Sequence, residues 1–185
     1  MTPTQEVCNA LSMLLATFVF AQQTVQHWPN GPLTILLLGS VMHLPTSVAY
    51  HMLSSCRRLL QRLDQSMIHL SGAFFAFALS GGSWFFVGIY LCHGVFAISR
   101  IWKKKRERRW VQVAFSVLLW MWPMVGHMQF VVAAVAFYGG GLCSIPEVNK
   151  RYLGGWGHTL FHLGVAMTAW SMCRFCCAKP THAHA

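Results

Sequence analysis

Acidic side chains are scarce in this sequence. Its 185 residues include four Asp and Glu against 14 Lys and Arg, and charged residues make up 10% of the chain. Soluble globular domains carry about 25% charged residues. With 55% apolar residues, so little charge excludes an ordinary soluble domain, whose surface must face water. A chain surrounded by lipid has no such requirement, so the composition indicates an integral membrane protein.

The net charge of +10 lies mostly in three short clusters, separated by long uncharged runs. That is the pattern of basic loops between membrane spans rather than of a basic face that binds nucleic acid. We therefore expect no nucleic-acid partner, and we expect the basic loops to contact anionic lipid headgroups. The clusters are Arg57, Arg58 and Arg62; Lys103, Lys104, Lys105, Arg106, Arg108 and Arg109; and Lys150 with Arg151.

The seven cysteines do not form the pattern of a disulfide framework. Four of them lie in or near apolar runs, where cysteine packs as a small hydrophobe. The group "CRFCC" leaves metal binding, redox chemistry, palmitoylation and simple packing at a helix end all open. Its members are Cys173, Cys176 and Cys177.

Turn-forming segments divide the uncharged runs into seven predicted spans. A helix crosses the bilayer in about 20 apolar residues, so the stretches 64–101 and 110–143 are each too long for one crossing. "SGGS" at 80–83 divides the first, and Pro123 with Gly126 divides the second. We expect one domain over residues 1–185, an all-α bundle of seven transmembrane helices. The predicted spans are about 6–26, 33–55, 64–80, 83–101, 110–123, 126–143 and 156–177.

The basic clusters also predict the orientation. With seven spans, the connections 2–3, 4–5 and 6–7 lie on one side of the membrane, and these connections carry the three clusters. The positive-inside rule places them in the cytosol, together with the N-terminus. The C-terminus would lie on the opposite side. The membrane could be a bacterial inner membrane or a eukaryotic internal or plasma membrane.

Polar side chains gather at the predicted cytosolic ends of three spans. Ser47 and His51, four residues apart, close span 2, and Asp64, the one aspartate of the chain, opens span 3. His158 and His162 open span 7 with the same spacing, which places both on one helical face. Two such imidazoles and a third from another helix can bind Zn²⁺ and leave its fourth position to water, as in catalytic sites.

A zinc ion at this site would lower the pKa of its water toward about 7. Asp64 could then accept the proton, and Ser47 could donate a hydrogen bond to a developing oxyanion. His43 shares the helical stripe of Ser47 and His51, one turn or more deeper, and its role is open. Other histidines within spans are expected to pair with a serine or a backbone carbonyl; with His43 they are His69, His93 and His127. Glu6, Glu107 and Glu147 are expected to be end or loop residues without a role in the site.

Three motifs carry a resemblance to a known family. They are S-x3-H closing span 2, "LDxSxI" opening span 3 and H-x3-H opening span 7. In order and placement they resemble the hemolysin III and progestin/adiponectin-receptor (PAQR) family. That family belongs to the wider CREST group of membrane hydrolases, which includes the alkaline ceramidases. The resemblance implies a seven-helix bundle with zinc near the cytosolic leaflet, bound by His51, His158 and His162.

The resemblance also implies that Asp64 contacts the zinc-bound water, that Ser47 accompanies the site, and that the reaction is hydrolysis of a lipid amide, such as ceramide, or of a related lipid bond. The chain departs from the family in lacking the expected Tyr and Pro after Asp64. Only Glu6 precedes Asp64 among the acidic residues, so the calcium site of alkaline ceramidases is not expected here.

The sequence therefore predicts a zinc-dependent intramembrane hydrolase of a lipid amide or ester. The alternative is a seven-helix lipid receptor or sensor whose zinc is structural and which turns over no lipid. In either case the expected partner is a membrane lipid. Pore formation is less favoured, because a pore would need a polar stripe through the whole membrane, whereas the polar residues here gather at one depth.

Overall fold

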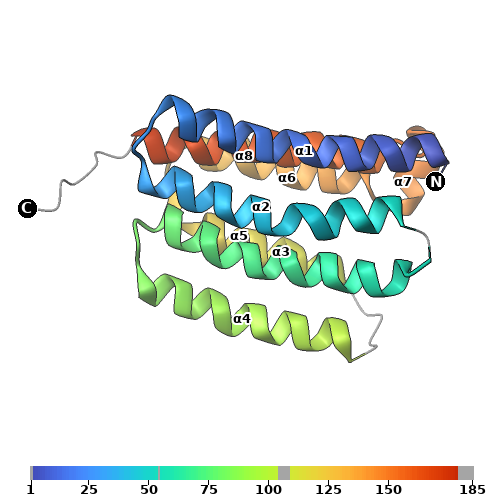
Figure 1. Ribbon diagram of the computed structural model, residues 1–185, viewed down its shortest axis with the longest axis horizontal. Coiled ribbons are helices and arrows are strands. Elements are labelled where there is room, and N and C mark those ends of the chain that lie inside the picture. The colour runs from blue at the N-terminus through green and yellow to red at the C-terminus, as the bar shows by residue number, and fades with distance from the viewer. Residues whose placement is uncertain (1, 54, 104–108, 179–185) are drawn as a thin grey trace, which may run out of the picture.

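A computed structural model of the protein describes residues 2–53, 55–103 and 109–178. Within these residues all regular secondary structure is helical (Figure 1). The helices are α1 (Pro3–Gln26), α2 (Gly31–Met52), α3 (Arg57–Leu79), α4 (Trp84–Trp102), α5 (Arg109–Met121), the short 3-10 helix η1 (Trp122–Met124), α6 (Met128–Cys143), α7 (Pro146–Tyr152) and α8 (Gly157–Ala178).

A helix covers each predicted span, and the two predicted breaks occur where the sequence placed them. At "SGGS", Gly81 and Gly82 adopt positive φ values of 71° and 88° between α3 and α4, a conformation that glycine allows without strain. Two features were not predicted. The helix α3 begins seven residues before 64 and so includes the basic residues Arg57, Arg58 and Arg62, and the basic connection after α6 contains α7.

Length and apolar character single out four of the described helices as able to cross a membrane, namely α1, α2, α4 and α8. A fifth candidate is α6 together with α7, which are bent by 73° at the break between them. The segment Val111–Met124 is apolar but shorter. The chain is therefore an all-helical protein with four or five candidate spans by these measures, and several long apolar helices suggest a multi-pass membrane protein.

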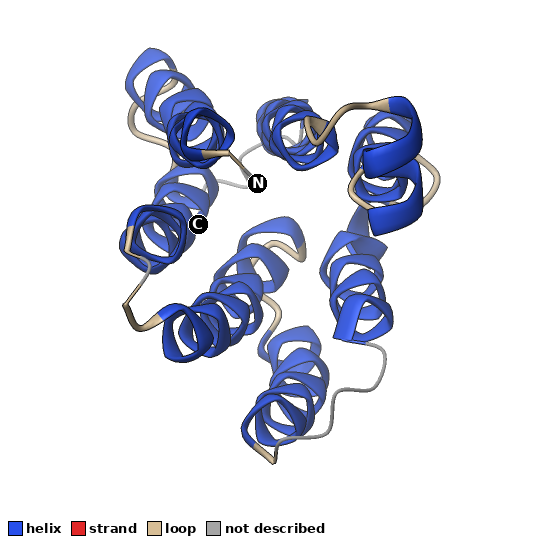
Figure 2. Ribbon diagram, turned by 90° about the vertical axis from the view of Figure 1, so that its right-hand side faces the viewer, coloured by secondary structure: helices blue, strands red, loops and turns tan. Residues whose placement is uncertain are grey.

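The helices pack side by side, and successive long helices run in opposite directions (Figures 1 and 2). One end of the bundle, on the right in Figure 1, holds the start of α1, the end of α2, the start of α3, the end of α4, the start of α5, and α7, while α8 ends at the other. The first and third basic clusters thus share one end, as predicted. Most of the second cluster, Lys104 to Arg108, lies outside the described residues.

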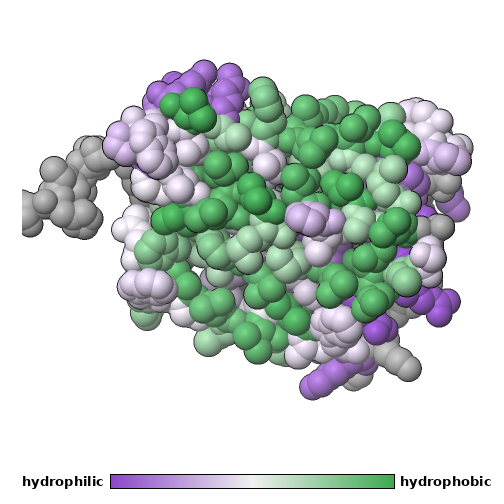
Figure 3. Space-filling model, viewed as in Figure 1, coloured by the Kyte–Doolittle hydropathy of each residue, from purple (hydrophilic) through white to green (hydrophobic). Residues whose placement is uncertain are grey.

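The surface of the bundle flank is apolar. The face shown in Figure 3 is largely hydrophobic, with hydrophilic residues mainly toward the ends. Large apolar side chains point outward there and on other faces; Phe18, Trp84 and Phe85 are 64%, 76% and 78% exposed. Exposed apolar surface of this extent is characteristic of a membrane-facing or partner-facing surface, and it agrees with the low charge of the sequence.

Glycines set the close approach of α6 and α8. A Cβ atom on Gly164 would lie 2.3 Å from the carbonyl oxygen of Ala136, and one on Gly157 would lie 1.9 Å from that of Cys143. Small residues allow two helix backbones to approach in this way. The contact fixes α8 against α6 and leaves another face of α8 turned toward α1 and α2, where the site described next is found.

Candidate metal centre

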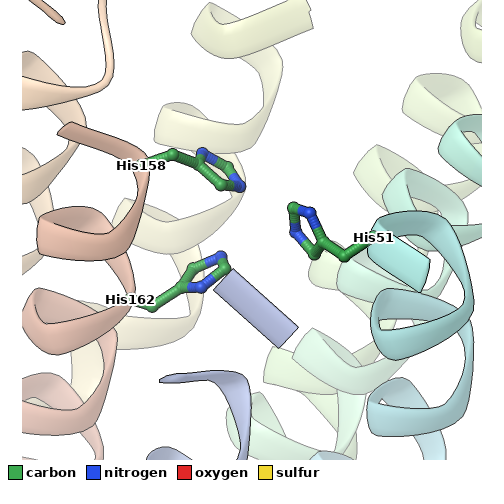
Figure 4. Close-up of side chains that lie close together, drawn as sticks. All are labelled: His51, His158 and His162. Atoms are coloured by element: carbon green, nitrogen blue, oxygen red, sulfur yellow. The ribbon is translucent and has the colours of Figure 1, made fainter. Parts of the chain in front are cut away.

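Three histidines from two helices lie together at the end of the bundle that holds the N-terminus (Figure 4). His51 is in the last turn of α2, and His158 and His162 are in the first two turns of α8. One nitrogen from each ring lies within 4.8 Å of the other two, and the ring centroids are 4.5 to 5.6 Å apart. The three residues predicted as ligands are therefore brought together, and the group could bind a metal ion.

Glu6 and Arg57 hold the outer side of the His51 ring. The Nδ1 atom of His51 donates to Oε2 of Glu6 at 2.8 Å, and the other carboxylate oxygen of Glu6 accepts from Arg57. A carboxylate can only accept in this pair, so His51 keeps a free lone pair on Nε2. A histidine whose second nitrogen donates to a carboxylate is the usual arrangement of a metal ligand.

Asn9 and Ser12 hold His162 in the same way. Its Nδ1 atom lies 3.0 Å from the carbonyl oxygen of Asn9 and 2.8 Å from Oγ of Ser12. Because the Ser12 hydroxyl donates to that same carbonyl at 2.9 Å, its oxygen is left to accept from His162. Both contacts require a proton on Nδ1, so the Nε2 lone pair of His162 is also free.

The residues that bond directly to these two ligands all come from α1. Glu6, Asn9 and Ser12 are three residues apart, which places them along one face of that helix. The expectation that Glu6 has no role in the site is wrong, because its carboxylate is bonded to a predicted ligand. One signal could have identified it: Glu6 lies at the predicted cytosolic end of span 1, at the depth used to select Asp64.

Asp64 is paired with His43. The Nε2 atom of His43 donates to Oδ1 of Asp64 at 2.9 Å, and the two side chains are 18% and 13% exposed. His43 was expected to pair with a serine or a backbone carbonyl, and that expectation is wrong, because a carboxylate two turns into α3 lies within its reach. The group of ligand atoms that lie within 4.8 Å of one another contains the three histidines and does not include the Asp64 carboxylate. Ser47 is buried, 3% exposed, one turn before His51 on α2.

The start of α8 is fixed by the short helix before it. The side-chain oxygen of Asn149 on α7 accepts from the backbone N–H of Gly157 at 2.8 Å and so caps the first turn of α8. Two glycines with positive φ, Gly154 and Gly155, make the turn between these helices, and Gln5 of α1 donates to the Gly154 carbonyl at 2.9 Å. These contacts set the position of His158, the second residue of α8.

The donor set fits a tetrahedral metal ion after small movements of the rings. Zinc binds imidazole nitrogens at about 2.0–2.1 Å, which puts ligand nitrogens about 3.3 Å apart. The nitrogens here lie within 4.8 Å of one another, so displacements of about 1 Å bring them to one ion. Three neutral imidazoles suit zinc and its neighbours in the first transition row.

A recess lies beside His51 at the end of the bundle. It has a volume of about 430 Å³ and is lined by His51 together with Glu6 and Arg57, and otherwise by apolar side chains. Of the three histidines, only His51 lines this recess, so a ligand in it would lie next to His51 and its partner Glu6.

The prediction for two other histidines agrees with the structure. His69 and His93 both contact the hydroxyl of Ser116, at 2.8 and 2.7 Å, as expected of histidines that join helices. The cysteines of "CRFCC" are not paired in disulfides. Cys173 and Cys176 are part of the apolar core and Cys177 packs against it, which favours the packing interpretation of that group.

The fold and the site define a class of protein: an all-helical chain with apolar helices long enough to cross a membrane and a histidine group that could hold a metal ion. No family model matches the chain, and neither a curated protein nor a solved structure matches it.

Proposed function

We propose that the protein is a zinc-dependent hydrolase that crosses the membrane seven times and cleaves an amide or ester bond of a lipid. The observation that carries the proposal is the convergence of His51, His158 and His162. The carboxylate of Asp64, bonded to His43, lies in the first turns of α3, toward the same end of the bundle. Three imidazoles with a nearby carboxylate are the residues that catalytic zinc sites use. The proposal includes kinship with the hemolysin III and progestin/adiponectin-receptor family, whose motifs these residues resemble.

Zinc held by three imidazoles supplies a water molecule activated for attack on a carbonyl carbon. Asp64 would accept a proton during the attack and return it to the leaving group, and His43 would keep its carboxylate oriented through their hydrogen bond. Ser47 would donate a hydrogen bond to the oxyanion that develops on the substrate. Glu6 and Asn9 would hold two of the ligands in the tautomer that presents Nε2 to the ion.

The orientation proposed from the sequence places this end of the bundle in the cytosolic leaflet. The start of α3 and the short helix α7 lie at the same end as the histidines, and their Lys and Arg residues favour the cytosolic side. The scissile bond of a lipid lies near the headgroup region of a leaflet, so a site at the end of the bundle is at the depth that such a bond occupies.

The test uses the purified protein in lipid vesicles that contain radiolabelled ceramide or phospholipid. Loss of a general base lowers the rate by about 10²–10⁴-fold, so we expect Asp64→Asn to retain zinc and to lose hydrolysis by that factor. Zinc retained in both proteins with no hydrolysis of any lipid by the unaltered protein would contradict the hydrolase proposal. That result would favour the alternative, a lipid receptor whose zinc is structural.

A further inference from the structure

The recess beside His51 has one polar wall and one apolar rim. Its charged wall is formed by Glu6 and Arg57. Its rim includes Val7, Met52 and Leu53, which are 42%, 54% and 54% exposed. A polar wall next to exposed apolar side chains at the end of a membrane-type bundle suits an amphiphile, with its headgroup in the recess and its chain along the apolar flank.

Arg57 is the cation of this wall. Its side chain is 48% exposed, and one of its terminal nitrogens donates to Glu6. A guanidinium carries five N–H donors, so donors remain for a second acceptor. Arg57 also lines an adjoining recess of about 470 Å³ formed by residues 55–59. Arginine is the side chain best suited to bind phosphate through two parallel hydrogen bonds.

The charges around the recess favour an anion. Among the described side chains at this end of the bundle, seven are cationic and three are acidic. Two of the acidic side chains, Glu6 and Asp64, are already bonded to histidines. The cations are Arg57, Arg58, Arg62, Arg100, Lys103, Lys150 and Arg151, and the third acidic residue is Glu147. The excess positive charge attracts anions to this end.

We propose that Arg57 recognises the headgroup, and that the lipid which the protein binds is an acyl lipid whose headgroup carries phosphate. The cleavage of this lipid rests on the proposed function, whereas its binding does not. Arg57 begins α3 beyond the last turn of α2, and one carboxylate group, that of Glu6, separates it from His51. In an acyl lipid the phosphate lies nearer to water than the first carbonyl group. A phosphate on Arg57 therefore leaves that carbonyl group beside His51, which lines the same recess.

The experiment compares ceramide 1-phosphate with ceramide, two lipids of the same acyl chain that differ only in the phosphate. Binding of fluorescent forms is measured in nonionic detergent with full-length protein carrying Asp64→Asn, so that turnover does not intervene. We expect the phosphate-bearing lipid to bind about tenfold more tightly, since one charge-assisted contact at a half-exposed site is worth that factor. Arg57→Gln should reduce the preference to about twofold or less.

Lys150→Gln is the matched control, because it removes a positive charge at the same end without touching the recess, and we expect it to keep the preference. Arg57→Lys keeps the charge but not the paired donors and should fall between the two, which gives a second measurement if Arg57→Gln does not fold. Equal binding of the two lipids, an unchanged preference in Arg57→Gln, or displacement of the lipid by an equal concentration of inorganic phosphate would each overturn the proposal.

The same lipids, supplied to protein with Asp64 intact, separate this proposal from the proposed function. Selective binding of ceramide 1-phosphate without hydrolysis of either lipid would leave the Arg57 proposal standing and contradict the hydrolase. Hydrolysis of both lipids at equal rates, with equal binding, would support the hydrolase and contradict the role of Arg57.

Discussion

Replacing Glu6 with Gln is expected to weaken metal binding without unfolding the protein. Glu6 is 12% exposed and accepts from Nδ1 of His51 at 2.8 Å. Its carboxylate orients the imidazole, and loss of such a partner lowers metal affinity by about 10–100-fold. Glutamine keeps an oxygen that can accept from His51 but removes the charge, and Arg57 already offsets part of that charge.

We therefore expect Glu6→Gln to lower zinc affinity by about tenfold, or about 1.4 kcal/mol. Glu6→Ala removes the acceptor as well, so its loss should be nearer a hundredfold. The assay is a competition titration with a chromophoric chelator on purified protein, and thermal unfolding is measured in parallel. Glu147→Gln is the control, because Glu147 is exposed on α7. If Glu6→Gln and Glu147→Gln bind zinc equally well, the orienting role of Glu6 is refuted.

Three further predictions concern single contacts. Gly164→Ala should lower the thermal midpoint of unfolding, because the new Cβ meets the Ala136 carbonyl at 2.3 Å and such overpacking costs about 1–3 kcal/mol of stability. Gly139→Ala on α6 is the control and should not lower the midpoint, because the space around Gly139 is open. Ser12→Ala should lower zinc affinity by less than about tenfold, because the Asn9 carbonyl still accepts from His162. His162→Ala should lose the metal. Equal losses of zinc affinity by the two variants in a zinc titration would contradict the orienting role assigned to Ser12. His43→Ala should leave zinc content unchanged and reduce the rate of lipid hydrolysis about tenfold, because the contact with Asp64 is lost. His27→Ala is the control, because His27 is exposed at the other end of the bundle. An unchanged rate of hydrolysis in His43→Ala would show that His43 does not position Asp64.

The position of the three histidines at one end of the bundle could be predicted, because it depends on two simple quantities. The spacing of His158 and His162 fixes their shared helical face, and the alternation of basic and uncharged connections fixes which helix ends lie together. Seven of the described helices, all except α7 and η1, alternate in direction, which places His51 at the same end. That α2 and α8 approach closely enough for the three rings to meet depends on helix packing.

The contacts that complete the site could not be predicted, because they depend on the lateral packing of the helices. Glu6 bonds a residue 45 positions away, and His162 bonds a residue 153 positions away, so local spacing carries no sign of either pair. His43 pairs with Asp64 rather than with a serine because α2 and α3 are neighbours in register. The capping of α8 by Asn149 likewise depends on α7, a helix too short to show a periodic pattern.

The central claim is that His51, His158 and His162 bind one zinc ion, and zinc-edge X-ray absorption of the purified protein tests it directly. The expected spectrum has three imidazole nitrogens at about 2.0–2.1 Å and one further oxygen around each zinc. Sulfur neighbours at about 2.3 Å, which would indicate the cysteines of α8 instead, or a protein that carries no zinc after purification in zinc-containing buffer, would contradict the claim.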